Sequence, residues 1–184
     1  MSFENIKPGY YCGVDPGADG AIVELLYADG PYIPEKWHVQ LVYRLKDYDF
    51  SKDQDRKALR SALNEWNGHS HHVTGVERVQ GMPRQSGPAS FNFGRNYGFL
   101  LGALLDDEKT RTFYHLPKSA WAFVVGIPFD KRDDKKAAVE LAVRLVPGLV
   151  KYKNRAGNVP DGIAEAALIA IAAAIQESKQ NAFS

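Results

Sequence analysis

Two short apolar stretches joined by a glycine-rich turn constrain how this chain begins to fold. Residues 10–14 (YYCGV) and 21–27 (AIVELLY) are rich in aromatic and β-branched side chains, which favour β-strands. The intervening PGADG favours a tight turn, because Pro presets φ and Gly accepts a positive φ. The sequence therefore predicts a β-hairpin. Asp15 stands at its first corner, where it either only starts the turn or also holds a ligand.

The remainder of the chain alternates strand patterns with helix patterns. Polar and apolar residues alternate over 37–45, which predicts a third strand. Apolar residues at helical spacing predict a helix over 51–66, and the β-branched run 73–79 then predicts a strand that crosses back parallel to the first. The further predicted elements are a helix over 91–105, a strand over 111–116, and helices over 117–124, 133–146 and 161–176.

This order of elements predicts an α/β fold. We expect a mixed five-stranded sheet whose first three strands are antiparallel, with helices on both faces. A chain of 184 residues is long enough for one well-buried core and short for two, so we expect a single domain over residues 1–184.

Three glycines recur every four residues in the predicted helix 91–105. Gly94, Gly98 and Gly102 therefore share one face of that helix. Glycine in a helix interior is unfavourable, so we expect this face to meet a neighbour at close range. Tight packing against the sheet is the simpler explanation, and pairing with the same helix of a second copy is the alternative.

Composition narrows the class of protein. Lysines and arginines number 23 and acidic residues 22, so the net charge of +1 neither requires nor excludes a polyanionic partner. Cys12 is the sole cysteine of the sequence, which excludes an internal disulfide and a thiolate metal site. The first ten residues lack an apolar core of signal-peptide length, and no apolar run is long enough to span a bilayer. We therefore expect a cytoplasmic protein with no membrane partner.

Four acidic residues occupy the ends of predicted elements. Asp15 ends the first strand, Glu77 ends the strand VTGVE, and Asp161 and Glu165 open the last helix. A spacing of four residues puts the last two on the same side of their helix. If the first and fourth strands are neighbours, their ends share one rim of the sheet, where α/β proteins build active sites. We expect the four carboxylates to face one space.

A cluster of carboxylates at neutral pH requires a cation, because like charges in a partly buried site repel each other. Ligands that are all oxygen favour Mg²⁺ or Mn²⁺. Two such ions about 4 Å apart would clamp a phosphodiester, one activating a water and the other stabilising the leaving 3′-oxygen. Each acid alone also has a structural explanation, as a turn residue, an ion-pair partner, a helix cap or a first-turn acid. Their combination, in this order and on these elements, favours the metal site.

The segments that hold these acids resemble those of a known family. The motifs GVDPGADGAIV, VERV, PASFNFGRNYGFLLGAL, DDKKAAVELAVRLVP and DGIAEAALIA occur in this order. They resemble the RuvC-type Holliday junction resolvases of the RNase H-like superfamily, especially the phage-encoded branch. The resemblance extends over residues 10–175 and is weakest over 31–68. Each motif alone is unspecific, whereas the set is specific.

The resemblance implies an RNase H-like fold and a dimeric, Mg²⁺-dependent endonuclease that nicks two opposed strands of a four-way DNA junction. Mn²⁺ is expected to substitute for Mg²⁺. By position, Asp15, Glu77, Asp161 and Glu165 match the catalytic acids of the family, which hold the metal ions. In the sequence DDKK, Lys135 matches a lysine expected to touch the DNA backbone near the cut.

The expected partners follow from the same resemblance. Lys136, Arg84 and Lys118 are further expected contacts to branched DNA. A glycine-bearing helix like 91–105 forms the dimer contact in the family, which favours the dimer alternative for that helix. A resolvase of this kind acts in the cytoplasm of a bacterium or, if phage-encoded, in that of its host.

Two positions depart from the family pattern. Cellular RuvC has an aromatic residue three positions after the acid of the fourth strand, where this chain has Gln80, so junction opening and sequence preference are expected to differ. The spacing between Asp161 and Glu165 is four rather than three. Both spacings keep one helical face, so we expect metal ligation to be retained.

Two other classes of protein are alternatives to a nuclease. An RNase H-like module that binds branched DNA without cutting is the main alternative, but a DNA-binding face would gain from the loss of its acids. An actin-like or sugar-kinase-type phosphotransferase also starts with an acid and glycines. Such folds need a second large domain, and the sequence contains no Gly-x-x-x-x-Gly-Lys-Ser/Thr loop.

Overall fold

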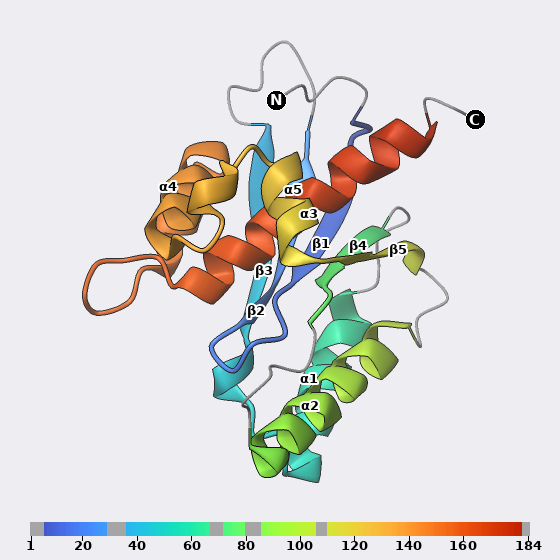
Figure 1. Ribbon diagram of the computed structural model, residues 1–184. Coiled ribbons are helices and arrows are strands. Elements are labelled where there is room, and N and C mark those ends of the chain that lie inside the picture. Colours follow the sequence, from blue (N-terminus) through green and yellow to red (C-terminus); the bar gives the residue numbers. More distant parts are fainter. Residues whose placement is uncertain (1–5, 29–35, 67–71, 80–85, 106–109, 182–184) are drawn as a thin grey trace.

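A single mixed β-sheet forms the centre of the molecule in the computed structural model (Figure 1). The structure describes residues 6–28, 36–66, 72–79, 86–105 and 110–181. The strand order is β3-β2-β1-β4-β5, with β1 antiparallel to β2, β2 antiparallel to β3, and β1, β4 and β5 parallel. The strands are β1 (Gly9–Val14), β2 (Ala21–Tyr27), β3 (Trp37–Arg44), β4 (His72–Glu77) and β5 (Thr110–Leu116).

Helices cover both faces of this sheet. Helices α1 (Asp53–Trp66) and α2 (Gly87–Leu105) pack on one face. Helices α3 (Lys118–Val124), α4 (Lys135–Leu145) and α5 (Asp161–Asn181) pack on the other. Short 3-10 turns are η1 (Leu45–Asp47), η2 (Phe129–Lys131) and η3 (Pro147–Tyr152). The predicted five-stranded α/β fold is thus confirmed, including the antiparallel start of the sheet.

Helix α5 is the buried centre of its side of the molecule. Residues 162–175 are all buried, because the sheet covers one side of the helix and α3 and α4 cover the other. This explains why the helix is apolar all round, whereas a surface helix would show one apolar stripe. A helix sandwiched in this way is held rigidly, and two of the acids lie in its first two turns.

Two glycines allow α5 to lie unusually close to the sheet. A Cβ atom on Gly13 would overlap the backbone of Ala166 and Ala170, and one on Gly162 would overlap the backbone at Asp19 and Gly20. Glycine is required at such positions because no side chain fits. The first contact places the middle of α5 directly on β1, and the second fixes its start against the turn between β1 and β2.

The bounds of several helices differ from the predicted ones. Helix α2 begins at Gly87 rather than 91, because a proline, here Pro88, is tolerated in the first turn. Helix α4 begins at Lys135 rather than 133, because the side chain of Asp134 caps it by accepting hydrogen bonds from the next backbone N–H groups. Helix α5 continues to Asn181.

The glycine face of α2 does not pack as the sequence predicted. Gly94, Gly98 and Gly102 are exposed, and a Cβ atom on any of them would meet nothing within 4 Å. The expected tight packing of this face against the sheet is therefore wrong for the part of the chain that the structure describes. Leu100, Ala103 and neighbouring residues on the opposite face make the contact with the core instead.

Among the described residues, no helix has the length and apolar character needed to cross a membrane.

Candidate active site

The register of two parallel strands brings the first two acids together. Val14 of β1 pairs with Val76 of β4, so Asp15 and Glu77 follow in register at the carboxyl ends of adjacent strands. Side chains alternate along a strand, and Val14 and Val76 belong to the core under α1 and α2. Asp15 and Glu77 therefore face the side of the sheet that carries α5. The sequence-based condition, that the first and fourth strands are neighbours, is met.

Helix α5 adds the third carboxylate. Its start is fixed against the turn after β1, so Glu165, one turn into the helix, reaches the two strand-end acids. One carboxylate oxygen each from Asp15, Glu77 and Glu165 lies within 4.8 Å of the others. Glu165 is 8% exposed, so this group is held in a largely enclosed place.

Asp161 lines the same cavity but stands apart from this group. Its carboxylate pairs with Lys135 of α4 at 2.9 Å and is 45% exposed. The cavity has a volume of about 530 Å³, and all four predicted acids line it, together with Lys118 and Lys135. Three acids thus form the inner part of the site, and Asp161 belongs to its outer part.

Asp15 starts the turn, and its carboxylate also faces the other acids. One oxygen of its carboxylate accepts a hydrogen bond of 2.9 Å from the backbone N–H of Gly17, as in an aspartate-initiated turn. The carboxylate also faces Glu77 and Glu165. The turn therefore orients the carboxylate toward the other acids.

Burial, with a smaller contribution from neighbouring charges, raises the pKa values of the two strand-end acids. Burial, followed by the negative charges of Asp15 and Glu165, raises the pKa of Glu77 from 4.5 to about 7. Burial raises the pKa of Asp15 from 3.8 to about 6, although the hydrogen bond from Gly17 opposes this shift. Near neutral pH the group therefore retains protons that a bound cation would displace.

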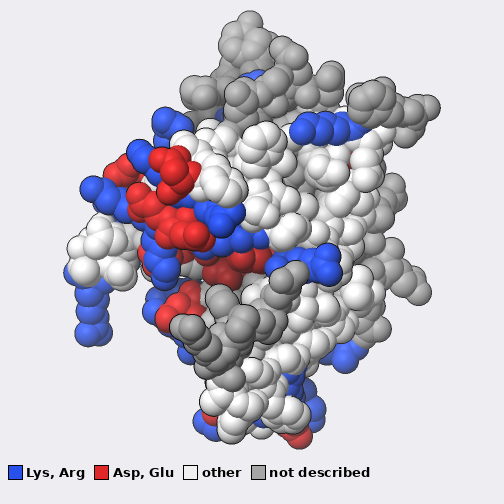
Figure 2. Space-filling model, in the orientation of Figure 1, with Lys and Arg blue, Asp and Glu red and all other residues white. Residues whose placement is uncertain are grey.

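Two lysines partly compensate the negative charge. Lys118, at the start of α3, donates a hydrogen bond of 2.9 Å to Glu165 and lies over the ring of Trp121. Burial alone would lower the pKa of Lys118, but the hydrogen bond and charge of Glu165 outweigh it, and the pKa is raised. Lys135 pairs with Asp161 in the outer part. Figure 2 shows acidic side chains gathered on one face of the molecule with lysines and arginines among them.

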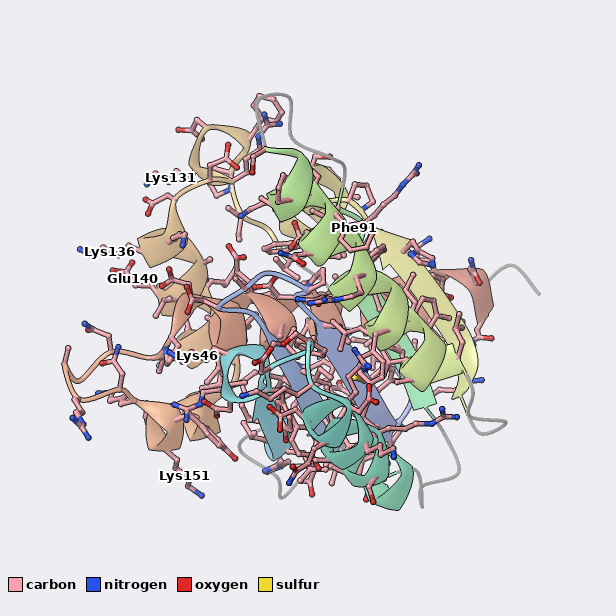
Figure 3. The ribbon with its side chains drawn as sticks, turned by 90° about the horizontal axis from the view of Figure 1, so that it is seen from below. Lys46, Phe91, Lys131, Lys136, Glu140 and Lys151 are labelled. Atoms are coloured by element: carbon pink, nitrogen blue, oxygen red, sulfur yellow. The ribbon has the colours of Figure 1, made fainter. Side chains whose placement is uncertain are left out.

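The other predicted DNA contacts lie outside the cavity or outside the described residues. Lys136 is 84% exposed, points outward (Figure 3) and lies 3.9 Å from Glu140. Arg84 and Gln80 fall in the segment 80–85, outside the residues that the structure describes.

Sequence reasoning missed Lys46, which also lines the cavity. The backbone N–H of Leu45 donates a hydrogen bond of 2.9 Å to the carbonyl of Gly20, which holds η1 against the turn after β1 and brings Lys46 there. Asn154, in the loop after η3, lines the cavity as well. Neither residue stands in a pattern that reveals this position, because the fold of the chain, and not local spacing, brings each to the cavity.

The donor set fits a hard divalent cation. The three inner side chains are all carboxylates, and one oxygen from each lies close enough to the others for the group to hold one ion. Oxygen-only ligands of this kind suit Mg²⁺ or Mn²⁺. The buried acidic group can therefore hold a metal ion.

Comparisons with known proteins give a match in structure alone. A comparison with protein-family models finds no match, and neither does one with curated proteins. Among solved structures, RuvC of T. thermophilus in complex with a Holliday junction substrate is similar with a TM-score of 0.66 and 14% identity, over 94% of this chain and 96% of that chain. A second Thermus thermophilus RuvC structure matches with a TM-score of 0.59 and 13% identity, over 93% and 96%. On the strength of this likeness and of the sheet topology, the chain has a RuvC-like fold.

Proposed function

We propose that this protein is a metal-dependent endonuclease that cuts four-way or related branched DNA junctions. One observation carries the proposal: three carboxylates from β1, β4 and α5 converge within 4.8 Å in a chain whose fold resembles that of a RuvC bound to a Holliday junction. A purely structural role does not account for three neighbouring acids that are buried or half-buried, because their mutual repulsion costs stability.

In this proposal, Asp15, Glu77 and Glu165 hold Mg²⁺ or Mn²⁺, and Asp161 completes a site for two ions. Bound there, the metal would activate a water for attack on a phosphodiester and stabilise the leaving 3′-oxygen. Lys118 and Lys135 neutralise the carboxylates in the metal-free protein. When the carboxylate charge is taken up by metal ions, both ammonium groups become available to the phosphates of the DNA.

The proposed DNA surface extends outward from the carboxylates. Lys118 and Lys135 contact phosphates at the cut, and Lys136 contacts the DNA further away. Arg84 remains a DNA contact expected from the sequence. Such contacts to phosphates position the DNA without reading its sequence. The second site that a four-way junction needs comes from a second copy of the chain.

We propose that α2 forms the contact of this homodimer. Its glycine face is exposed, and the apolar residues Phe91 and Leu105 are 70% and 55% exposed. A face without side chains lets the backbones of two helices approach closely, which compensates the entropic cost of glycine in a helix. A C2 dimer would place two metal sites on opposed strands of one junction.

Cleavage of a synthetic four-way junction tests the function. We expect Mg²⁺-dependent nicking by the native protein and a loss on the order of a thousandfold in Asp15→Asn, because the amide removes a negatively charged ligand. Asp130→Asn, an exposed aspartate of η2, is the matched control and keeps full activity. Equal cleavage by Asp15→Asn would contradict the proposed site. Tight junction binding without cleavage in Mg²⁺ or Mn²⁺ would favour the non-catalytic binding module.

A further inference from the structure

A second cavity, the side cavity, lies beside the carboxylates. It has a volume of about 450 Å³ and lies between the turn after β1, the segment 45–50 and the first half of α2. Gly17, Ala18, Lys46 and Phe93 line both this cavity and that of the carboxylates. A group bound in the side cavity is therefore adjacent to a phosphate bound at the carboxylates.

Flat apolar groups and side-chain amides line the side cavity together. Tyr48 and Phe93 offer aromatic rings, and Asn92 and Asn96 offer amides. The two asparagines are four residues apart on α2, so they lie on the same side of the helix. Arg95 adds a positive charge on the α2 side of the cavity, as Lys46 does in the shared wall. The negative charge of Asp49, which also lines the cavity, is paired with Lys52.

Among the described residues, the two amides make few hydrogen bonds. Within the part of the chain that the structure describes, the side chain of Asn92 has no hydrogen-bond partner. The amide oxygen of Asn96 accepts only long contacts of 3.4 Å from the guanidinium of Arg95. An amide presents a donor and an acceptor side by side, which complements the edge of adenine.

The aromatic ring between the two cavities is held in place. Phe93 stacks on Tyr97 with ring centroids 6.1 Å apart and planes 13° from parallel. The hydroxyl of Tyr97 lies 3.3 Å from Nδ1 of His115 on β5. A ring supported in this way is already ordered before a ligand arrives, so less entropy is lost on binding.

Resting on the proposed nuclease function, we propose that the side cavity binds one unpaired nucleobase, preferentially adenine, next to the phosphate that is cut. The volume suits one nucleotide. Aromatic rings stack on any base, the asparagines recognise its edge, and Lys46 and Arg95 attract the neighbouring phosphates. A base stacked inside a duplex cannot enter such a cavity without being extruded, and extrusion costs least where pairing is already broken. The side cavity therefore favours cuts beside branch points.

Junctions that lack single bases test this assignment. Each nucleotide within two positions of the cut is replaced, one at a time, by an abasic analogue. For the native protein we expect one position at which base removal slows cleavage about tenfold. In the double variant Asn92→Ala, Asn96→Ala the intact junction is already cut about tenfold more slowly, and removal of that base has no further effect. Asn181→Ala, a matched change at the far end of α5, behaves like the native protein. Equal tolerance of every abasic position by the native protein would overturn the proposal.

A binding measurement separates this proposal from the nuclease function. Single-stranded tetranucleotides dA4 and dT4 are titrated into the native protein while the side-chain amide signals of Asn92 and Asn96 are followed by NMR. We expect both signals to shift, with dA4 binding more tightly than dT4, even if no junction is cleaved. Unshifted signals at millimolar dA4 would overturn the base site, whereas shifted signals without any cleavage would overturn only the nuclease.

Discussion

The inner and outer parts of the candidate site each contain one ion pair, and the two pairs differ in their exposure to water. Lys118 with Glu165 and Lys135 with Asp161 are both lysine–carboxylate pairs with a separation of 2.9 Å. The inner side chains are 31% and 11% exposed, whereas the outer ones are 69% and 45% exposed. Water screens the outer pair and leaves the inner pair strongly coupled. The two separations are equal, so the difference lies in burial. The inner pair is held firmly, whereas the outer pair exchanges partners easily.

The largest expected difference between the two parts is in activity. Glu165→Gln removes a member of the enclosed carboxylate group, and we expect junction cleavage to fall on the order of a thousandfold. Asp161→Asn alters the exposed part, and we expect a loss of about tenfold. Single-turnover cleavage of a four-way junction at saturating Mg²⁺ measures both. Equal losses in the two variants would show that the outer acid belongs to the same functional unit as the inner three.

Substitutions of the two lysines should differ in their effect on the stability of the protein. Lys118→Met leaves the inner carboxylates without their cation. We therefore expect the unfolding free energy of the metal-free protein to fall by about 2 kcal/mol at pH 8. This loss is smaller than the loss expected for breaking a fully buried pair, because Lys118 is partly exposed. Lys135→Met should change it by at most about 0.5 kcal/mol. Urea denaturation in EDTA measures both, and Mg²⁺ should restore stability to Lys118→Met in particular. A loss in Lys135→Met as large as that in Lys118→Met would contradict the role given to burial.

The last expected effect is a pH dependence to which the inner acids contribute. The folded-state pKa of Glu77 is raised from 4.5 to about 7 and that of Asp15 from 3.8 to about 6. The folded protein thus binds more protons than the unfolded chain in this window, so the stability contributed by these groups is complete below about pH 4 and is lost as the pH rises to 7.

We therefore expect the unfolding free energy of the metal-free protein to fall less steeply between pH 5 and 7 in Glu77→Gln than in the native protein. Burial also raises the pKa of Glu24 on β2, to about 8. Its contribution to the pH dependence of the unfolding free energy is the same in both proteins and cancels in this comparison. Glu140→Gln, an exposed acid of α4, is the control and should keep the native slope. Identical slopes in Glu77→Gln and the native protein would contradict the raised pKa of Glu77.

Local patterns in the sequence predicted the elements and the identity of the acids. The hairpin, the helical spacings and the positions of Asp15 and Glu77 at strand ends depend on neighbours in the chain, which is why they are visible there. The glycine repeat of α2 shows the limit of such a pattern. Spacing reveals that Gly94, Gly98 and Gly102 share one face, but only packing decides that this face is left uncovered.

Tertiary structure decided how the acids are grouped. The pairing of Val14 with Val76 brings Asp15 beside Glu77, and the close approach of α5 at Gly13 and Gly162 adds Glu165. The same packing places Asp161 beside Lys135 in the outer part and Lys118 beside Glu165 in the inner part. The sequence by itself determined which chemical groups are present and on which elements, because these follow from local spacing. Their distances, burial and shifted pKa values depend on contacts between residues far apart in the chain, so only the folded structure decided them.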